Sequence, residues 1–194
     1  MLEDGSVYEG TARGDFKETA CEIVFNTSMT GYVEILTDPS YAGQGVVMTY
    51  PMIGNYGISR EDFESERLQP SAFIVHELSS DPSNFRCTDT IENLLKEYNI
   101  PCISGVDTRA VVKKLRESGT MRGVLTSDIG DRERLMDVIK SFRQIDLVGS
   151  VTAKQTKVYG EENTGAEIAL MDFGTKRNII NNLVKRNCIV TVYP

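Results

Sequence analysis

Ile100-Pro-Cys-Ile-Ser-Gly-Val-Asp-Thr-Arg-Ala-Val-Val-Lys-Lys-Leu-Arg-Glu-Ser-Gly119 is the stretch that decides the fold class, because its hydrophobic period changes in the middle. The short apolar run Ile100–Ser104 predicts a buried strand. Asp107 predicts the N-cap of a following helix, and Gly119 lies just past the end of that helix. The apolar side chains that this helix is expected to bury are Val111, Val112 and Leu115. A strand that leads directly into an amphipathic helix is typical of an α/β domain.

The alternation continues on both sides of this stretch. Met121–Thr126 predicts the next strand, and a further amphipathic helix is expected to start near Asp131. Upstream, Asp89 and Glu92 match a capping box for a helix that precedes the quoted strand. Helices and strands therefore alternate up to about Gly149.

The first half of the chain is richer in short strands separated by polar turns. The runs that predict strands are Gly5–Gly10, Cys21–Phe25, Val33–Leu36, Gly45–Tyr50 and Ala72–Leu78. Strands at this spacing fit a compact sheet or a partly closed barrel. Residues 1–149 are therefore predicted to form one strand-rich β/β/α domain of the α/β class.

A different unit follows. Residues 150–166 have few apolar side chains and no clear period, so they are predicted to be an exposed linker. Glu167–Phe173 and Cys188–Tyr193 predict two strands, joined by a helix over Thr175–Asn187. This helix is expected to bury Ile179, Ile180, Leu183 and Val184. One βαβ unit cannot cover both faces of its sheet, so residues 167–194 are predicted to be the start of a domain that is truncated here.

Composition excludes several classes of protein. The chain has 194 residues, with 21 basic and 28 acidic side chains and a net charge of −7. Such a chain repels phosphate backbones, and its largest basic cluster is Lys113-Lys114-Leu115-Arg116, so no nucleic-acid partner is expected. No apolar run approaches the roughly 20 residues of a membrane helix, so no membrane partner is expected either.

The single histidine and the four cysteines narrow the chemistry further. One histidine cannot build a His-rich metal site, and no cysteines have Cys-x-x-Cys spacing, so no metal site is predicted. The N-terminus has no signal-peptide pattern, which predicts a cytoplasmic protein with reduced thiols. Cys21, Cys87 and Cys102 are interpreted as small core residues. His76 lies in an apolar run and is interpreted as structural.

Two other motifs allow competing interpretations. Asp172-Phe173-Gly174 matches a short kinase motif, but the other kinase motifs are absent, so a strand end with a turn glycine is favoured. Asn26–Ser40 concentrates hydroxyls and amides around Gly31 and Pro39. Such a segment can hold a polar ligand or dock a partner, and it can equally be turn chemistry without any ligand.

The same segment resembles the small chain of glutamine-hydrolysing carbamoyl-phosphate synthase. Similar blocks occur in order along nearly the whole chain. They are Asn26–Tyr32, Glu34–Tyr41, Thr49–Pro51, Ile53–Gly57, Ser83–Arg86, Ile103–Arg109, Leu115–Gly119 and Asp172–Ile179.

The resemblance implies a function in ammonia supply. In that family the small chain hydrolyses L-glutamine, and the ammonia passes to a large chain that uses ATP and Mg to make carbamoyl phosphate from bicarbonate. The product serves pyrimidine and arginine synthesis. The resemblance also implies that residues 167–194 begin a flavodoxin-like, doubly wound class I glutamine amidotransferase domain. No cofactor is expected in this chain itself.

The resemblance transfers one site residue. Ser40 corresponds to a serine that contacts bound glutamine, and its hydroxyl can donate or accept a hydrogen bond. The family nucleophile is a cysteine on a Gly-x-Cys-x-Gly-x-Gln elbow, paired with His and Glu, and none of these is found here. Cys188 does not match that elbow. No catalytic residue is therefore assigned, and the chain alone is expected to be inactive.

Two further hypotheses accompany the enzyme-subunit prediction. One is a stand-alone module that docks on the large chain without catalysis, and the other is a small-molecule sensor that uses Asn26–Ser40. Family members also begin with several apolar residues before the turn Leu2-Glu3-Asp4-Gly5. The first strand is therefore expected to be shortened or missing, with lower stability or an exposed sheet edge as the result.

Overall fold

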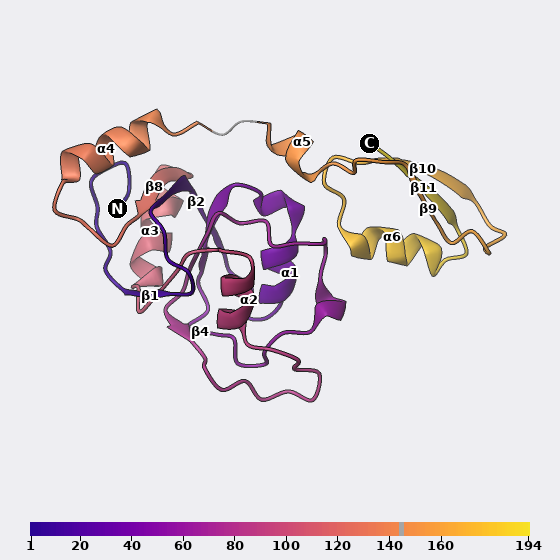
Figure 1. Cartoon of the computed structure of the whole chain (residues 1–194), viewed down its shortest axis with the longest axis horizontal. Helices are drawn as coiled ribbons and strands as arrows, with labels where there is room; N and C mark the ends of the chain where they lie inside the picture. Colours follow the sequence, from indigo (N-terminus) through magenta and orange to yellow (C-terminus); the bar gives the residue numbers. More distant parts are fainter. Residues whose placement is uncertain (144–145) are drawn as a thin grey trace.

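A six-stranded sheet forms the centre of the first part of the chain (Figure 1). The computed structural model describes residues 1–143 and 146–194. In spatial order the strands are β1 (Thr11–Arg13), β7 (Cys102–Ser104), β5 (Ala72–Ile74), β3 (Gln44–Met48), β2 (Thr19–Asn26) and β8 (Met121–Leu125). The inner four strands are parallel, and β1 and β8 run antiparallel at the two edges. The predicted α/β class is confirmed, and of the two arrangements considered the molecule adopts an open sheet.

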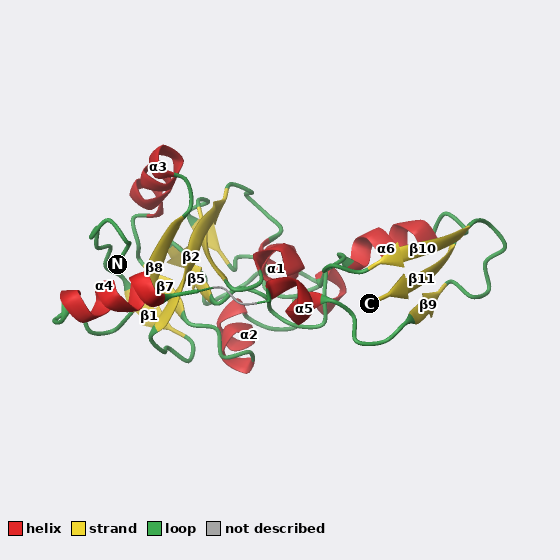
Figure 2. Ribbon diagram, turned by 90° about the horizontal axis from the view of Figure 1, so that it is seen from above, coloured by secondary structure: helices red, strands yellow, loops and turns green. Residues whose placement is uncertain are grey.

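Helices cover both faces of this sheet (Figure 2). The face that carries Val46 and Met48 packs against α1 (Tyr32–Thr37) and α2 (Ile91–Glu97). At β8, α4 (Arg132–Ser141) covers the same face through Val124. The opposite face packs against α3 (Thr108–Ser118) and the N-terminal segment. Side chains alternate between the two cores along each strand, as pleated geometry requires.

Shorter elements complete the first part of the chain. The remaining elements are β4 (Met52–Ile53) paired with β6 (Glu77–Leu78), the 3-10 turns η1 (Pro39–Tyr41) and η2 (Arg60–Asp62), and α5 (Leu147–Val151).

The predicted helix caps are confirmed at two helices and displaced at a third. The Asp107 carboxylate accepts from the Ala110 amide at 2.9 Å, and the Asp131 carboxylate accepts from the Arg134 amide at 2.9 Å. At α2 the N-cap is Thr90, whose hydroxyl accepts from the Asn93 amide at 3.2 Å. The expected Asp89–Glu92 capping box is therefore wrong by one residue.

Two predicted strands are absent as strands. Val33–Leu36 lies inside α1, where Tyr32, Val33 and Leu36 share one buried face, so packing overrides the strand preference of this sequence. Gly5–Gly10 forms no strand, although the residues before it extend the sheet. Leu2 bridges Gly123, and the Glu3 amide donates to the Arg122 carbonyl at 2.9 Å, so the β8 edge is partly paired.

The C-terminal part contains the predicted βαβ unit. In it, β10 (Glu167–Met171) and β11 (Ile189–Tyr193) are parallel and are joined by α6 (Arg177–Val184). A third strand, β9 (Lys157–Tyr159), pairs antiparallel with β11. Residues 150–166, predicted to be an exposed linker, therefore supply a sheet strand. The domain boundaries themselves and the flavodoxin-like detail stay predictions.

One side of the small sheet is covered and the other is open. Ile180 on α6 packs against Val190 and Val192. Met171 and Tyr193 on the other side are 58% and 41% exposed, as expected for a single βαβ unit. Ile179, predicted to be buried, is half-exposed because it lies about 100° around the helix from Ile180.

Candidate functional site

Ser40 lies in a hydrogen-bonded 3-10 turn at the amino edge of the central sheet. It is the middle residue of η1, between the end of α1 and the start of β3. The Asp38 carboxylate accepts from the Ser40 amide at 2.9 Å, and Pro39 occupies the first turn position. The Ser40 residue is exposed. The predicted turn around Pro39 is therefore present, and Ser40 is exposed on it.

Asp38 connects this turn to the C-terminal part of the chain. One oxygen of the carboxylate holds the Ser40 amide, and the other lies 2.7 Å from the Lys176 ammonium. The Asp38 residue is buried, and this hydrogen bond raises the pKa of Lys176. One carboxylate therefore fixes the Ser40 turn and pairs with a cation just before α6.

The turn after β10 has its own carboxylate. Asp172 accepts from the amides of Gly174 and Thr175 at 3.1 and 2.8 Å, and from the Ala153 amide at 2.6 Å. Burial by itself raises the pKa of Asp172, but these amides outweigh burial and lower it. This arrangement confirms the strand end with a turn glycine at Asp172-Phe173-Gly174.

The two turns pack directly against each other. Gly174 has φ of +97°, and a methyl group there would lie 2.9 Å from Pro39 Cβ and 2.8 Å from Val151 Cγ2. Glycine is therefore required both by the backbone conformation and by the close approach. The structure thus brings together the segment 26–40 and the motif 172–174, which lie far apart in the sequence.

Sequence reasoning missed the polar contacts that join these parts. Glu64, which follows η2, accepts from the Arg177 amide with its carbonyl at 2.8 Å and from the Asn178 amide with its carboxylate at 2.9 Å. The Arg67 guanidinium donates to the Ser150 carbonyl at 3.1 Å. Nothing in the local pattern around Glu64 indicates such a role, because its partners are more than 100 positions away.

The cysteines and the histidine differ in their burial and contacts. Burial raises the pKa of Cys21 and of Cys102 to about 12, so neither is a thiolate at neutral pH. Both are core residues as predicted, whereas Cys87 is only half-buried. His76 Nδ1 lies 3.1 Å from the Val106 carbonyl oxygen at the carboxyl edge of the sheet. Cys188 is half-buried just before β11.

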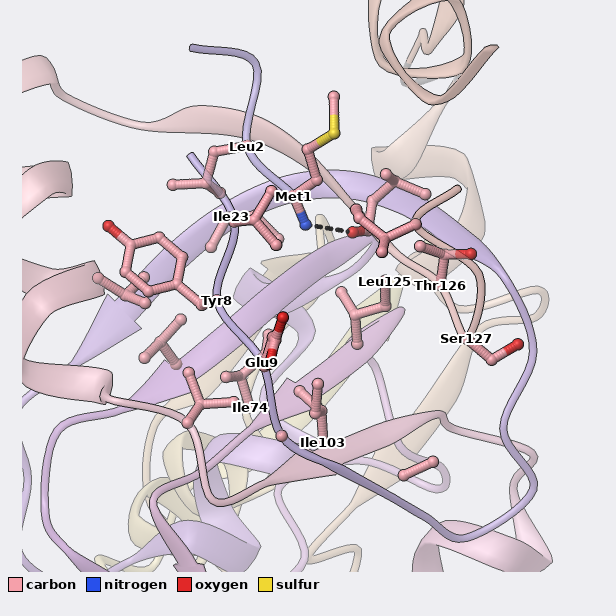
Figure 3. A pocket seen from close by; sticks show the side chains of 18 of the residues that line it. Met1, Leu2, Tyr8, Glu9, Ile23, Ile74, Ile103, Leu125, Thr126 and Ser127 are labelled. Atoms are coloured by element: carbon pink, nitrogen blue, oxygen red, sulfur yellow. Dashed lines mark hydrogen bonds between the residues drawn. The ribbon is translucent and has the colours of Figure 1, made fainter. Parts of the chain in front are cut away.

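A separate apolar cavity of about 400 Å³ lies between the N-terminal segment and β8 (Figure 3). Ile23, Ile74 and Ile103 contribute to its hydrocarbon lining. The Met1 ammonium donates to the Val124 carbonyl at 2.9 Å, and burial lowers its pKa. This cavity is a gap in the core on the α3 face of the sheet and contains no predicted site residue.

Residues 1–143 and 146–194 contain neither a metal site nor a membrane-spanning helix. These residues contain no group of three or more His, Cys, Asp or Glu side chains placed to hold a metal ion. Within the same ranges, none of the helices has the length and apolar character needed to cross a membrane.

Comparison with known proteins agrees with the resemblance seen in the sequence. The family model of the carbamoyl-phosphate synthase small chain, CPSase domain, matches residues 1–125. The small chain of Clostridium perfringens is 48% identical, with all of this chain and 55% of the relative aligned. Small chains of Archaeoglobus fulgidus and Listeria monocytogenes serotype 4b are 47% and 44% identical, again over all of this chain and over 54% and 53% of theirs. The chain thus spans about half the length of the curated relatives it matches. By the match over its first 125 residues, this chain belongs to the carbamoyl-phosphate synthase small chain family.

Proposed function

We propose that this chain is the N-terminal half of a glutamine amidotransferase subunit of carbamoyl-phosphate synthase. The subunit would release ammonia from L-glutamine and pass it to a large chain, a ligase that uses ATP and Mg to make carbamoyl phosphate from bicarbonate. The match of the family model over residues 1–125 is the observation that carries this proposal. The cytoplasm is the expected compartment, and the four free thiols agree with it.

Within this function, Ser40 is proposed to contact the substrate. Its amide is held by Asp38, so the turn is ordered before any ligand binds. An exposed hydroxyl on an ordered turn can hydrogen-bond the polar head of glutamine with little loss of conformational entropy. No catalytic residue is assigned in this chain, because none of its four cysteines lies on a Gly-x-Cys-x-Gly-x-Gln elbow.

The test is a hybrid protein in which residues 1–194 replace the matching half of the Clostridium perfringens small chain, assayed with the large chain of that organism. Ser40→Ala should raise the KM for glutamine about fivefold, the equivalent of one lost hydrogen bond of about 1 kcal/mol. Ser83→Ala, at another exposed serine, is the matched control and should leave the KM unchanged.

Synthesis from added ammonia should be unaffected in both variants, since it bypasses glutamine binding. An unchanged glutamine KM in Ser40→Ala would remove the role of Ser40. A folded hybrid that supports ammonia-dependent but not glutamine-dependent synthesis would contradict the proposed function as a whole. It would favour the docking module without catalysis.

A further inference from the structure

A second cavity, of about 650 Å³, lies beyond the carboxyl ends of the four parallel strands. Thr27 and Thr49 line it directly after β2 and β3, and His76 lines it after β5. Thr108, the first residue of α3, follows β7 and completes this arrangement. The crevice outside the carboxyl ends of parallel strands is the usual place for ligands in open α/β sheets.

This cavity is distinct from the candidate glutamine site. Ser40 precedes β3 and therefore lies at the amino edge of the same sheet, together with the contacts to Lys176 and Gly174. The two edges are separated by the length of the strands. An inference about the carboxyl edge therefore does not depend on the role of Ser40.

Three cations line the cavity from one face of α3. Arg109, Lys113 and Arg116 follow one another at i, i+4 and i+7, which places them along one stripe of the helix. In the described part of the chain, none of the three forms a salt bridge with a carboxylate. Their neighbour Lys114, on another face of α3, is paired with Asp4 at 2.9 Å.

One of these cations, Arg116, stacks on an aromatic ring. The guanidinium carbon of Arg116 lies 5.5 Å from the ring centroid of Phe25 on β2. Such stacking orients the guanidinium and leaves its N–H groups available as donors. The hydroxyls of Thr27 and Thr49 at the same cavity add further donors.

The local charge contrasts with the charge of the whole chain. The lining carries three cations against the carboxylates of Asp107 and Glu117, a local balance of +1, whereas the chain carries −7. Asp107 is already engaged as the N-cap of α3. The cavity therefore presents unneutralised donors in an otherwise acidic molecule.

We propose that this cavity binds a small anion with a phosphate group, free or as part of a phosphorylated metabolite. Arg109, Lys113 and Arg116 supply the charge, and the threonine hydroxyls complete the hydrogen bonds to the phosphate oxygens. Planar guanidinium groups match the geometry of phosphate oxygens, and hydrogen bonds between charged groups are stronger than neutral ones.

The experiment is a titration of the isotope-labelled 194-residue chain with inorganic pyrophosphate at low ionic strength, followed by two-dimensional NMR. Saturable shifts are expected at the amides of Thr27, Thr49 and Thr108. The double variant Lys113→Gln with Arg116→Gln should bind pyrophosphate at least about tenfold more weakly. Its spectrum also reports whether it is folded.

The matched control is Arg132→Gln with Lys140→Gln on α4, which removes the same charge from exposed positions elsewhere. It should leave the affinity within about twofold. Equal weakening in both double variants, or the absence of saturable shifts at the cavity, would overturn the proposal. Shifts at the cavity with an aspartate-rich peptide but none with pyrophosphate would overturn it too, and would identify the face as a protein contact.

Discussion

At the scale of the residue, single groups serve two neighbours at once. The Asp38 carboxylate accepts a hydrogen bond from the Ser40 amide and also pairs with Lys176. Gly174 adopts a left-handed backbone conformation and also lies in close contact with Pro39. A substitution at such a position removes more than one interaction. The cost at Gly174 can be separated into its two parts, because the chain offers another glycine with similar backbone geometry.

Gly174→Ala is expected to destabilise the chain more than Gly5→Ala does. Gly5 has φ of +86° with nothing within 4 Å, so an alanine there bears only the backbone strain, about 1–2 kcal/mol. At Gly174 the methyl group also meets Pro39 and Val151 at under 3 Å. Thermal unfolding monitored by circular dichroism should show the larger fall in Tm for Gly174→Ala. Equal falls would mean that the two turns separate without cost.

At the scale of the element, the sequence predicted best where local signals and packing agree. The α3 helix has an acidic N-cap, an apolar stripe and a terminal glycine, and all three are found where expected. Val33–Leu36 has β-branched side chains yet forms a helix, because the packing of Tyr32 and Leu36 decides its conformation. β9 was missed because a strand of three exposed residues has no hydrophobic period to detect.

Glu18, just before β2, and Arg134 on α4 form an ion pair whose contribution to stability depends on pH. The two terminal guanidinium nitrogens of Arg134 each donate to a Glu18 carboxylate oxygen at 2.8 Å. These hydrogen bonds, with one from Thr126, lower the pKa of Glu18 from 4.5 to about 2. A lowered acid pKa contributes stability above pH 4.5 that is lost as the pH falls toward 2. Because both side chains are partly exposed, Glu18→Gln should cost at most about 1 kcal/mol at pH 7.

Urea unfolding at several pH values tests the contribution of this ion pair to stability. Between about pH 5 and 8, the difference in free energy of unfolding between the unsubstituted chain and Glu18→Gln should be roughly constant. Below about pH 4.5 this difference should shrink. Glu162→Gln, at an exposed carboxylate without a bonded partner among the described residues, serves as the control. A difference that grows on acidification would contradict the assignment.

At the scale of the whole molecule, the C-terminal part is joined to the central sheet by polar contacts at one edge. Glu64 supplies acceptors to the first amides of α6, whose own N-cap, Lys176, makes no side-chain capping bond. The sequence predicted both parts but not this joint. Capping by a residue from a distant part of the chain has no short-range pattern, so only the three-dimensional arrangement reveals it.

Glu64→Ala should therefore loosen α6 while leaving the central sheet intact. Loss of a capping acceptor costs about 0.5–2 kcal/mol, so the amides of residues 177–180 should exchange with solvent several-fold faster or more. Glu66→Ala is the control, because that side chain is 83% exposed and lies 3.7 Å from Lys157. Hydrogen exchange read by mass spectrometry distinguishes the two variants. Unchanged protection of α6 in Glu64→Ala would show that its N-terminus needs no partner.

The order of the strands also governs how the molecule can assemble. β2 pairs with β8, and the hydrogen bond between Thr126 and Glu18 beside that pair spans 108 positions of the sequence. During translation β2 is synthesised long before β8, so the β2 edge that pairs with β8 stays unpaired until β8 is made. Contacts between residues this distant make folding slow relative to that of proteins with local pairing. The sheet is therefore completed late in synthesis. Until β8 is made, β2 can pair only with β3, its parallel neighbour that is synthesised earlier.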